Sequence, residues 1–259
     1  VVVNTRHIRH KAMPLSWRGE NMKKTKTNTE LSRAVLRQSA WFKTLPTELQ
    51  DEILTSSAQR QYSKDEIIFR EDQPAIGICA VIAGEVAISR MAGAENECLL
   101  HVGGPGMWFG EVSVLIRRET AVTARTLTDT EILVLPSAEF ERIVEENPHY
   151  YRSFATPALQ RSQIMLRMIA GSQNLSPEQY LRLRLADLAE LWISDSQRDT
   201  EVEVSLSQSQ LAQMIGASRQ TVNALLKKLE SDGLVRTKFR KIVISDIDGL
   251  RGERRRTGL

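Results

Sequence analysis

Cysteines are scarce in this chain, and long apolar runs are absent. Its 259 residues include two cysteines, Cys79 and Cys98, which are too few for a disulfide framework in a chain of this size and suit a reducing compartment. No apolar stretch approaches the ~18–20 residues of a membrane span. The apolar run at the N-terminus is too short for the core of a signal peptide, and basic residues interrupt it. These absences predict a cytoplasmic protein without a membrane segment.

The net charge is also small, at +3, so total charge gives only a faint indication of a nucleic-acid partner. Basic residues concentrate instead in the stretches RTKFRKIVI and RGERRRTGL near the C-terminus, and residues 251–259 are predicted to form a basic tail. Residues 1–29 are polar and basic without periodicity, which predicts a disordered tail. Either Val1 or Met22 could be the biological start.

Residues 30–147 are predicted to form an N-terminal domain rich in β-structure. A helical pattern runs through LSRAVLRQSAWFKTL from Leu31, and Pro46 opens a second short helix. Between residues 60 and 136, short runs of β-branched residues are broken by Gly, Pro, Asn and Asp, which predicts small antiparallel strands. The stretch GGPGMWFGE indicates sharp turns rather than the interior of a strand. The helical period returns in SAEFERIVEEN.

Residues 148–172 are predicted to form a dimerisation helix, closed by a C-terminal cap at Gly171. Its apolar residues gather near one face. Such a stripe must be buried, either against a second copy of the chain or against a neighbouring helix. Pro157 should kink this helix or mark a restart with Thr156 as N-cap. The predicted dimer contacts are Phe154, Ala158, Met165 and Met168, and the stripe is widened by Leu159, Leu166 and Ile169.

Residues 173–250 are predicted to hold two short helices followed by a hairpin. Ser207 with Gln210 caps the first helix, Gly216 permits a tight turn, and Ser218 caps the second helix. The stretch LVRTKFRKIVIS predicts a two-stranded hairpin, or wing. Helix, tight turn and helix, with polar donors on the first turn of the second helix, is the helix-turn-helix arrangement. The buried stripe of the second helix is predicted to be Val222, Leu225, Leu226 and Leu229.

The polar donors on this second helix suit the major groove of DNA. Arg219 can donate two hydrogen bonds to guanine, and Gln220 or Asn223 can pair with adenine. The remaining hydroxyl and lysine side chains are better placed for phosphates, which fix register without reading sequence. The alternative is a plain αα-hairpin with a solvated polar face. The predicted DNA contacts are Ser218, Arg219, Gln220, Thr221, Asn223, Lys227, Lys228 and Lys238.

The stretches GASRQTVNALLKKLESDGLV and FGEVSVL resemble the Crp/Fnr (catabolite activator) superfamily of bacterial transcription regulators, over roughly residues 40–250. The resemblance implies an α+β fold with an N-terminal cyclic-nucleotide-binding-like β-roll, a long dimerisation helix and a C-terminal winged helix-turn-helix. It also implies a homodimer on a palindromic site in double-stranded DNA, with RNA polymerase as a candidate partner. Gln220 stands where many members have Glu, which predicts a different base preference.

The effector positions depart from those of cyclic-AMP-binding members. The resemblance assigns Gly110, Glu111 and Val112 to the effector pocket, and Glu111 matches the carboxylate that takes the ribose hydroxyl. Thr120 and Ala121, counted back from Arg125, stand where an Arg-Ser pair would hold the cyclic phosphate, so that donor is missing. Arg117 or Arg118 could substitute only in a reshaped loop. Met165 and Leu166 stand where a Thr-Ser pair would meet the adenine. These gaps disfavour cyclic AMP and leave the effector and cofactor unknown.

Metal centres are disfavoured as well. Fnr-type members hold an iron–sulfur cluster on four cysteines, which a chain with two cysteines excludes. Cys98 and His101 are three residues apart on a predicted strand and should point to opposite faces, so packing or solvent exposure explains them better than a metal. The other histidines, His7, His10 and His149, have no partners at ligand spacing.

We therefore expect a DNA-binding transcription regulator whose β-roll senses an effector other than cyclic AMP. One alternative is a cyclic-nucleotide-responsive activator with a reshaped phosphate loop. Another is an enzyme that uses the β-roll as a regulatory module, but the chain shows no nucleophile–base–acid set and no phosphate-cradling loop with a lysine. A structural or protein-interaction module would leave the outward donors of the second helix without a role.

Overall fold

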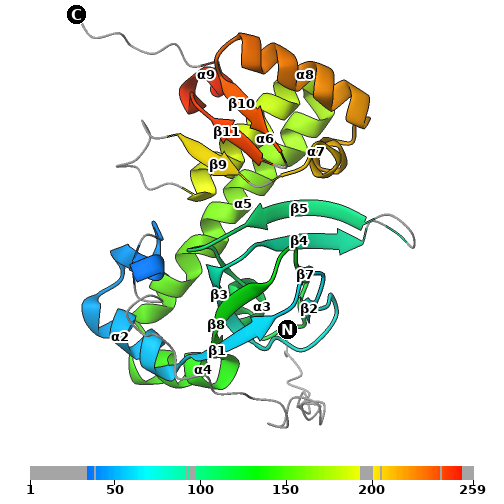
Figure 1. Ribbon diagram of the computed structural model, residues 1–259. Coiled ribbons are helices and arrows are strands. Elements are labelled where there is room, and N and C mark those ends of the chain that lie inside the picture. The colour runs from blue at the N-terminus through cyan, green and yellow to red at the C-terminus, as the bar shows by residue number, and fades with distance from the viewer. Residues whose placement is uncertain are drawn as a thin grey trace, which may run out of the picture.

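The computed structural model describes residues 34–37, 39–91, 93, 97–192, 201–204, 206–239 and 241–252. The predicted tail 1–29 and most of the predicted tail 251–259 lie outside the described residues. Figure 1 shows two halves connected by one long helix, with the larger sheets in the N-terminal half and a small sheet among helices in the C-terminal half.

The N-terminal half is a roll of two four-stranded sheets, with strand orders β1-β8-β3-β6 and β2-β7-β4-β5. All pairings in these sheets are antiparallel, which confirms the predicted β region. The stretch predicted to hold only turns contains β6, which pairs with β3; two residues are too few to show a strand pattern. The strands are β1 Ala58–Tyr62, β2 Ile67–Phe69, β3 Gly77–Ala83, β4 Val86–Met91, β5 Glu97–Gly103, β6 Trp108–Phe109, β7 Thr123–Thr126 and β8 Thr130–Pro136.

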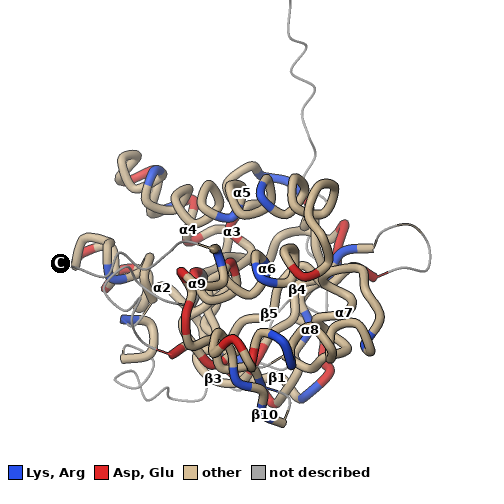
Figure 2. The backbone as a smooth tube through the Cα atoms, turned by 90° about the horizontal axis from the view of Figure 1, so that it is seen from above, with Lys and Arg blue, Asp and Glu red and all other residues tan. Residues whose placement is uncertain are grey.

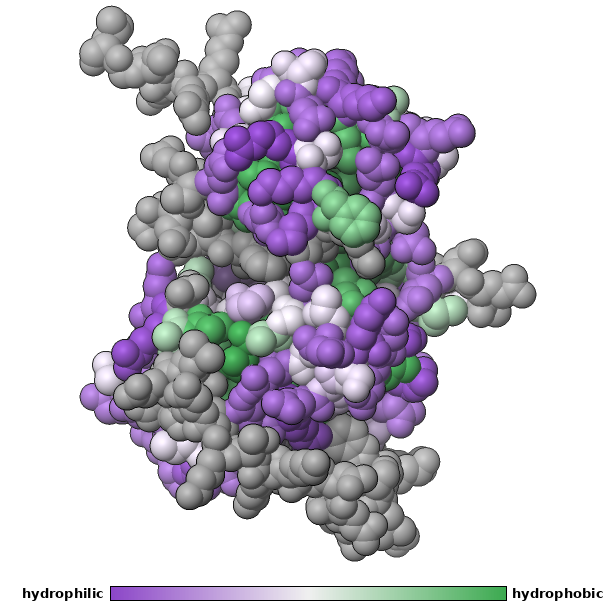
Figure 3. All heavy atoms as spheres, viewed as in Figure 1, coloured by the Kyte–Doolittle hydropathy of each residue, from purple (hydrophilic) through white to green (hydrophobic). Residues whose placement is uncertain are grey.

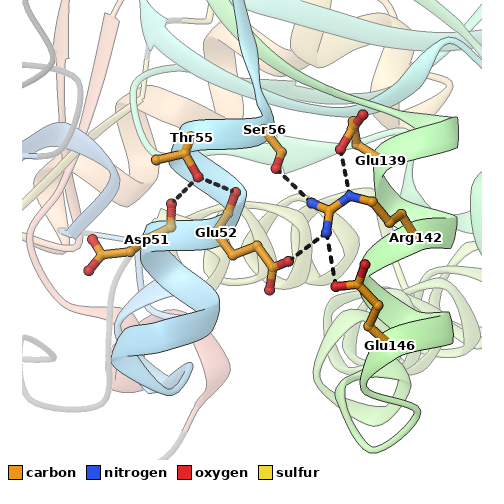
Figure 4. Close-up of polar contacts among 7 residues, drawn as sticks. All are labelled: Asp51, Glu52, Thr55, Ser56, Glu139, Arg142 and Glu146. Atoms are coloured by element: carbon orange, nitrogen blue, oxygen red, sulfur yellow. Dashed lines mark hydrogen bonds and ion pairs between the residues drawn. The ribbon is translucent and has the colours of Figure 1, made fainter.

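Short helices close the ends of the roll. Residues 34–37 are helical, and the further elements are a 3-10 turn Phe42–Thr44, α2 Thr47–Ser56, α3 Glu111–Leu115 and α4 Ser137–Glu146. Figure 4 shows Arg142 of α4 reaching across to α2, where its guanidinium donates to Glu52 and Ser56, both at 3.1 Å, and also to two carboxylates of its own helix. A network of this kind holds α2 and α4 together more firmly than one exposed ion pair would.

The core of this half is rich in aromatic side chains. Phe42 stacks on Trp108 with ring centroids 5.4 Å apart, and Phe140 meets Phe154 edge to face at 5.0 Å. Such pairs contribute about 0.5–1.5 kcal/mol beyond the burial of their area. Because Phe154 belongs to the long helix, the cluster attaches that helix to the roll. The prediction that Phe154 contacts a second copy is wrong, since its side chain is 0% exposed.

The long helix α5 spans Tyr150–Asn174. It passes through Pro157 as one helix, and the Thr156 hydroxyl donates to a backbone carbonyl one turn earlier instead of capping a restart. The predicted cap at Gly171 is also wrong, because the helix continues beyond it. A Cβ at Gly171 would lie 2.9 Å from Leu183 Cδ2. This glycine therefore lets the next helix approach closely.

The C-terminal half contains the predicted pair of helices and the wing. The strands β10 and β11 form the hairpin, and β9 adds a third strand beside β11. The last helix was not predicted; Asp246 caps it by accepting from Gly249 N, so the folded part continues past residue 250. The elements are α6 Pro177–Trp192, β9 Val202–Val204, α7 Gln208–Ile215, α8 Arg219–Ser231, β10 Val235–Lys238, β11 Lys241–Ile244 and α9 Ile247–Arg251.

The two halves share a hydrophobic core. Leu99 and Val102 of β5 belong to the same buried cluster as Leu185 of α6 and Leu211 of α7, and Figure 1 shows β5 running beneath α7. Arg184 of α6 is 2% exposed and donates to the backbone carbonyl of Leu100 in β5 at 2.9 Å. A buried guanidinium requires such partners, so this bond fixes the approach of the C-terminal half to the roll.

Candidate functional site

The turn between α7 and α8 is built from two serine caps and one glycine. Ser207 Oγ accepts from Gln210 N at 3.2 Å, and the Gln210 carboxamide oxygen accepts from Ser207 N at 2.8 Å. Gly216 has φ of 64°, a left-handed conformation that glycine adopts without strain. Ser218 Oγ accepts from Thr221 N at 3.0 Å. The predicted helix-turn-helix is confirmed in these details.

The first turn of α8 faces away from the protein. Its buried residues are Val222, Leu226 and Leu229, whereas Leu225, predicted in the same stripe, is only partly buried. Arg219 and Gln220 are exposed and form no hydrogen bond or ion pair with a described residue. Ser218 and Thr221, two other predicted DNA contacts, bond to each other through their hydroxyl groups in the cap of α8. Asn223 is half-buried. The side chains of Arg219, Gln220 and Asn223 are therefore free of bonds to described residues, and Asn223 is the least exposed of the three.

The predicted phosphate-binding lysines differ in their partners. Lys228 Nζ lies 2.7 Å from a carboxylate oxygen of Glu178 in α6, and Lys238 Nζ lies 3.2 Å from one of Glu203 in β9. Lys227 has no ion pair with a described residue. Figure 2 shows basic and acidic residues close together around α8 and β10. Exposed pairs of this kind contribute at most about 1 kcal/mol, so a phosphate can compete for either lysine.

The wing is held against α8. Thr237 N donates to a Glu230 carboxylate oxygen at 2.8 Å, which connects β10 to the end of α8. At the tip of the hairpin, Phe239 is 91% exposed. The sequence reasoning did not single out Phe239, because one aromatic residue within a basic stretch forms no pattern.

The Gly-Glu pair of the roll is bonded inside the chain. Gly110 has φ of 86°, and a Cβ there would lie 2.9 Å from Gly77 O, so the position requires glycine. Glu111 begins α3, is 2% exposed, and forms an ion pair with Arg161 of α5. Arg161 also donates to the Trp108 carbonyl at 3.0 Å. The carboxylate that the resemblance assigns to a ribose hydroxyl is thus neutralised by the long helix.

The other predicted effector residues do not offer a set of free donors either. Thr120 is 2% exposed, and its hydroxyl donates to the carbonyl oxygens of Arg70 and Gln73. Arg125 donates to the Asp65 carbonyl at 3.2 Å. The remaining two predicted positions, Val112 and Ala121, are exposed.

The loop that follows α3, where a cyclic phosphate would bind in cyclic-AMP-binding members, contains two arginines with different surroundings. Arg117 has φ of 52° and forms an ion pair with Glu141 of α4, with Nε 2.9 Å from a carboxylate oxygen. This pair raises the pKa of the Arg117 guanidinium and directs it toward α4. Arg118 is exposed.

The cysteines and histidines make no metal centre within the described ranges, where no group of three or more possible ligands occurs. A register shift in β5 opposite Ile88 and Ser89 breaks the strict alternation, so the argument that Cys98 and His101 must face opposite ways does not hold here. Burial, followed by the charges of Arg161 and Arg184, lowers the pKa of His101 to about 3.

In the part of the chain that the structure covers, no helix is both long and apolar enough to cross a bilayer.

Comparison with protein families matches both halves. Residues 59–147 match the model of the cyclic nucleotide-binding domain, and residues 181–253 match the Crp-like helix-turn-helix domain. The first match covers the roll and α4, and the second contains α7, α8 and the wing.

Relatives of known role are similar to most of the chain. The "HTH-type transcriptional regulator Cmr" of Mycobacterium tuberculosis is 27% identical over 230 residues, which are 85% of this chain and 89% of that protein. The "CRP-like protein Clp" of Xanthomonas campestris is 24% identical over 84% of this chain and 96% of its own length. Among solved structures, FixK2 of Bradyrhizobium japonicum has a TM-score of 0.64 at 18% identity, covering 76% of this chain and 96% of that one; it supports the fold alone.

A cyclic nucleotide-binding domain joined to a helix-turn-helix domain defines a class of transcription regulators rather than of enzymes. The chain belongs to the Crp/Fnr superfamily and is a Crp-like transcriptional regulator.

Proposed function

We propose that the protein is a homodimer that reads a palindromic DNA site with the first turn of α8. The observation that supports this proposal is the pair of unpartnered, exposed side chains Arg219 and Gln220 above a buried apolar stripe. In this role residues 30–147 form the effector domain, 148–172 the dimerisation helix and 173–250 the DNA-binding domain. The site of action is the cytoplasm, and RNA polymerase is a candidate partner.

The exposed face of α5 supports the homodimer. Leu159, Leu166 and Ile169 are 66%, 68% and 58% exposed. Their spacing of seven and then three residues places them on one seam, as in a coiled coil. Of the four predicted contacts, Met165 lies on the exposed surface at 47%, and Ala158 and Met168 are half-buried. A face with this much apolar surface is typical of an interface rather than of a free helix.

The contacts inside the roll support an effector other than cyclic AMP. A cyclic phosphate needs a charge-assisted donor, but Thr120 is buried and hydrogen-bonded to backbone carbonyls. Of the two side chains that a reshaped loop could use, Arg117 is paired with Glu141, whereas Arg118 is exposed. A ribose would also have to displace Arg161 from Glu111.

The test is selection of DNA from a random-sequence pool by the full chain at several salt concentrations. We expect an enriched palindrome whose half-sites lie about one helical turn apart, because a symmetric dimer presents two recognition helices. The logarithm of the binding constant should fall by several units per tenfold rise in salt. Recovery of a pool without any shared sequence would overturn the proposal.

A further inference from the structure

A cavity of about 630 Å³ lies between the two halves on the inner side of α5. One wall comes from the N-terminal segment and the β5–β6 region, another from α5, and a third from α6 and α9 of the C-terminal half. Figure 3 shows apolar atoms between the two halves on the face in view, bordered by hydrophilic atoms. A volume of this size is within the ~300–1,000 Å³ typical of small-molecule sites.

This cavity is separate from the predicted effector positions. Its lining contains none of Gly110, Glu111, Val112, Thr120, Ala121 and Arg125. It does include His101 and Arg161, which connect it to the roll.

The lining carries four cationic and two acidic side chains, and two of the cations, Arg161 and Arg167, are also paired with the buried carboxylates of Glu111 and Asp187 outside it. The two acids are Glu190 and Asp248, and the four cations are Lys43, Arg161, Arg167 and Arg251. Arg167 of α5 lies 3.0 Å from Glu190, and Arg251 of α9 forms an ion pair with the same carboxylate. Arg167 also donates to Asp187 Oδ1 through Nε and Nη2, at 3.1 and 2.9 Å, so only its Nη1 donors remain free. Arg251, which pairs with Glu190 through Nη2, keeps its Nε and Nη1 donors for a second anion. Lys43 has no ion pair with a described residue.

Aromatic and neutral polar groups complete the walls. Trp41 and Trp108 meet edge to face with centroids 4.9 Å apart. The buried indole N–H of Trp108 has no hydrogen-bond acceptor among the described residues, a condition that costs about 1–3 kcal/mol. His101 adds a second polar side chain without a hydrogen bond to any described residue. Because the Trp108 nitrogen is enclosed by the fold, the walls offer the His101 imidazole beside flat apolar surfaces.

We propose that this cavity binds an organic anion that carries an aromatic ring, with the anion against Lys43, Arg167 and Arg251 and the ring near Trp41 and Trp108. Because the walls come from both halves, such a ligand binds this arrangement of the halves best and stabilises it. Any effect of this stabilisation on DNA binding rests on the proposed function, whereas the binding of the anion to the cavity does not.

The experiment uses the full chain without DNA and the fluorescent anion anilinonaphthalene sulfonate as the probe. Gln163 is exposed on α5 and lines the cavity, so Gln163→Glu adds a negative charge there at constant size. We expect saturable binding that this variant weakens about tenfold by repulsion. Gln213→Glu, on the exposed surface of α7 and outside the lining, is the matched control and should leave binding unchanged.

A neutral analogue, N-phenylnaphthylamine, separates charge from apolar contact. Gln163→Glu should leave its binding unchanged, because it carries no charge to repel. If the two glutamate variants weaken the sulfonate equally, or if neither does, the anion site is not in this cavity. Failure to select a DNA sequence would leave these titrations unaffected, so the two proposals fail separately.

Discussion

On α8, Arg219 and Gln220 extend into solvent, whereas in the roll Glu111 and Thr120 are 2% exposed and bonded within the chain. Both halves match their family models, so the difference lies in side chains rather than in fold. The C-terminal half presents free donors on a rigid helix, and the N-terminal half uses its corresponding positions to hold its own loops and α5. A shared fold therefore does not imply a shared ligand.

The comparison depends first on a dimer, because one recognition helix reads only half a palindrome. Leu166→Glu places a carboxylate in the exposed seam of α5 and should yield monomers in analytical ultracentrifugation. Affinity for the selected palindrome should fall by at least about 100-fold, since the two half-sites are no longer bound together. Leu166→Met, which conserves volume and polarity, should remain dimeric. A dimeric Leu166→Glu protein would contradict the proposed interface.

The free donors of α8 are tested next. Arg219→Ala should weaken binding to the selected site about 5- to 150-fold, as expected for a lost guanine contact of ~1–3 kcal/mol, with little change on random DNA. Lys227→Ala should instead weaken both DNAs alike and reduce the salt dependence by about one unit. Electrophoretic shift titrations measure both. Equal weakening of both DNAs by Arg219→Ala would reassign Arg219 to phosphate contact.

The structural role of Thr120 distinguishes the roll from a ligand site. Thr120→Val should lower the free energy of unfolding by about 1–3 kcal/mol, because backbone groups of Arg70 and Gln73 lose their buried partner, without changing affinity for the selected DNA. Urea denaturation measures the first effect. Ala121→Ser, at the neighbouring exposed position, should have an effect near zero, and equal stability of Thr120→Val and the parent would count against this role.

The acid side of the stability curve reports on His101. Its pKa of about 3 in the folded chain lies below the ordinary value of about 6.5. Between these values the unfolded chain holds a proton that the folded chain does not, so stability falls as the pH drops, by at most about 1.4 kcal/mol per unit. His101→Gln should flatten this slope between pH 7 and 5 when urea denaturation is repeated across that range, and an unchanged slope would contradict the low pKa of His101.

The smallest expected effect concerns cyclic AMP. Calorimetry at millimolar nucleotide should show no specific heat, because the roll lacks a free cationic donor at the positions of Thr120 and Ala121. A stoichiometric titration in the micromolar range would reverse the comparison between the halves and make the roll a nucleotide site.

The successful sequence predictions share one property: their interactions are local. Ser207, Gly216 and Ser218 act within four residues of themselves, and each adopts the cap or turn that its side chain favours. The wing follows from a similarly local pattern. The two-residue strand β6 and the helix α9 were missed because each is too short for a period to appear.

The predictions that failed depended on distant contacts. Phe154 has the same apolar character as Leu159, and only packing against the roll separates the buried side chain from the exposed one. Gly171 has the residue type of a cap, but it accommodates Leu183 of the next helix instead.

By itself, the sequence determined the order of the elements, the capped helix-turn-helix and the absence of an Arg-Ser pair in the phosphate loop, because these are properties of neighbouring residues. Only the tertiary structure decided that Arg161 neutralises Glu111, that Arg184 of α6 holds β5, and that a cavity lies between the halves. The reason is physical: each of these features needs surfaces from distant parts of the chain to meet, and burial alone selects which surfaces do so.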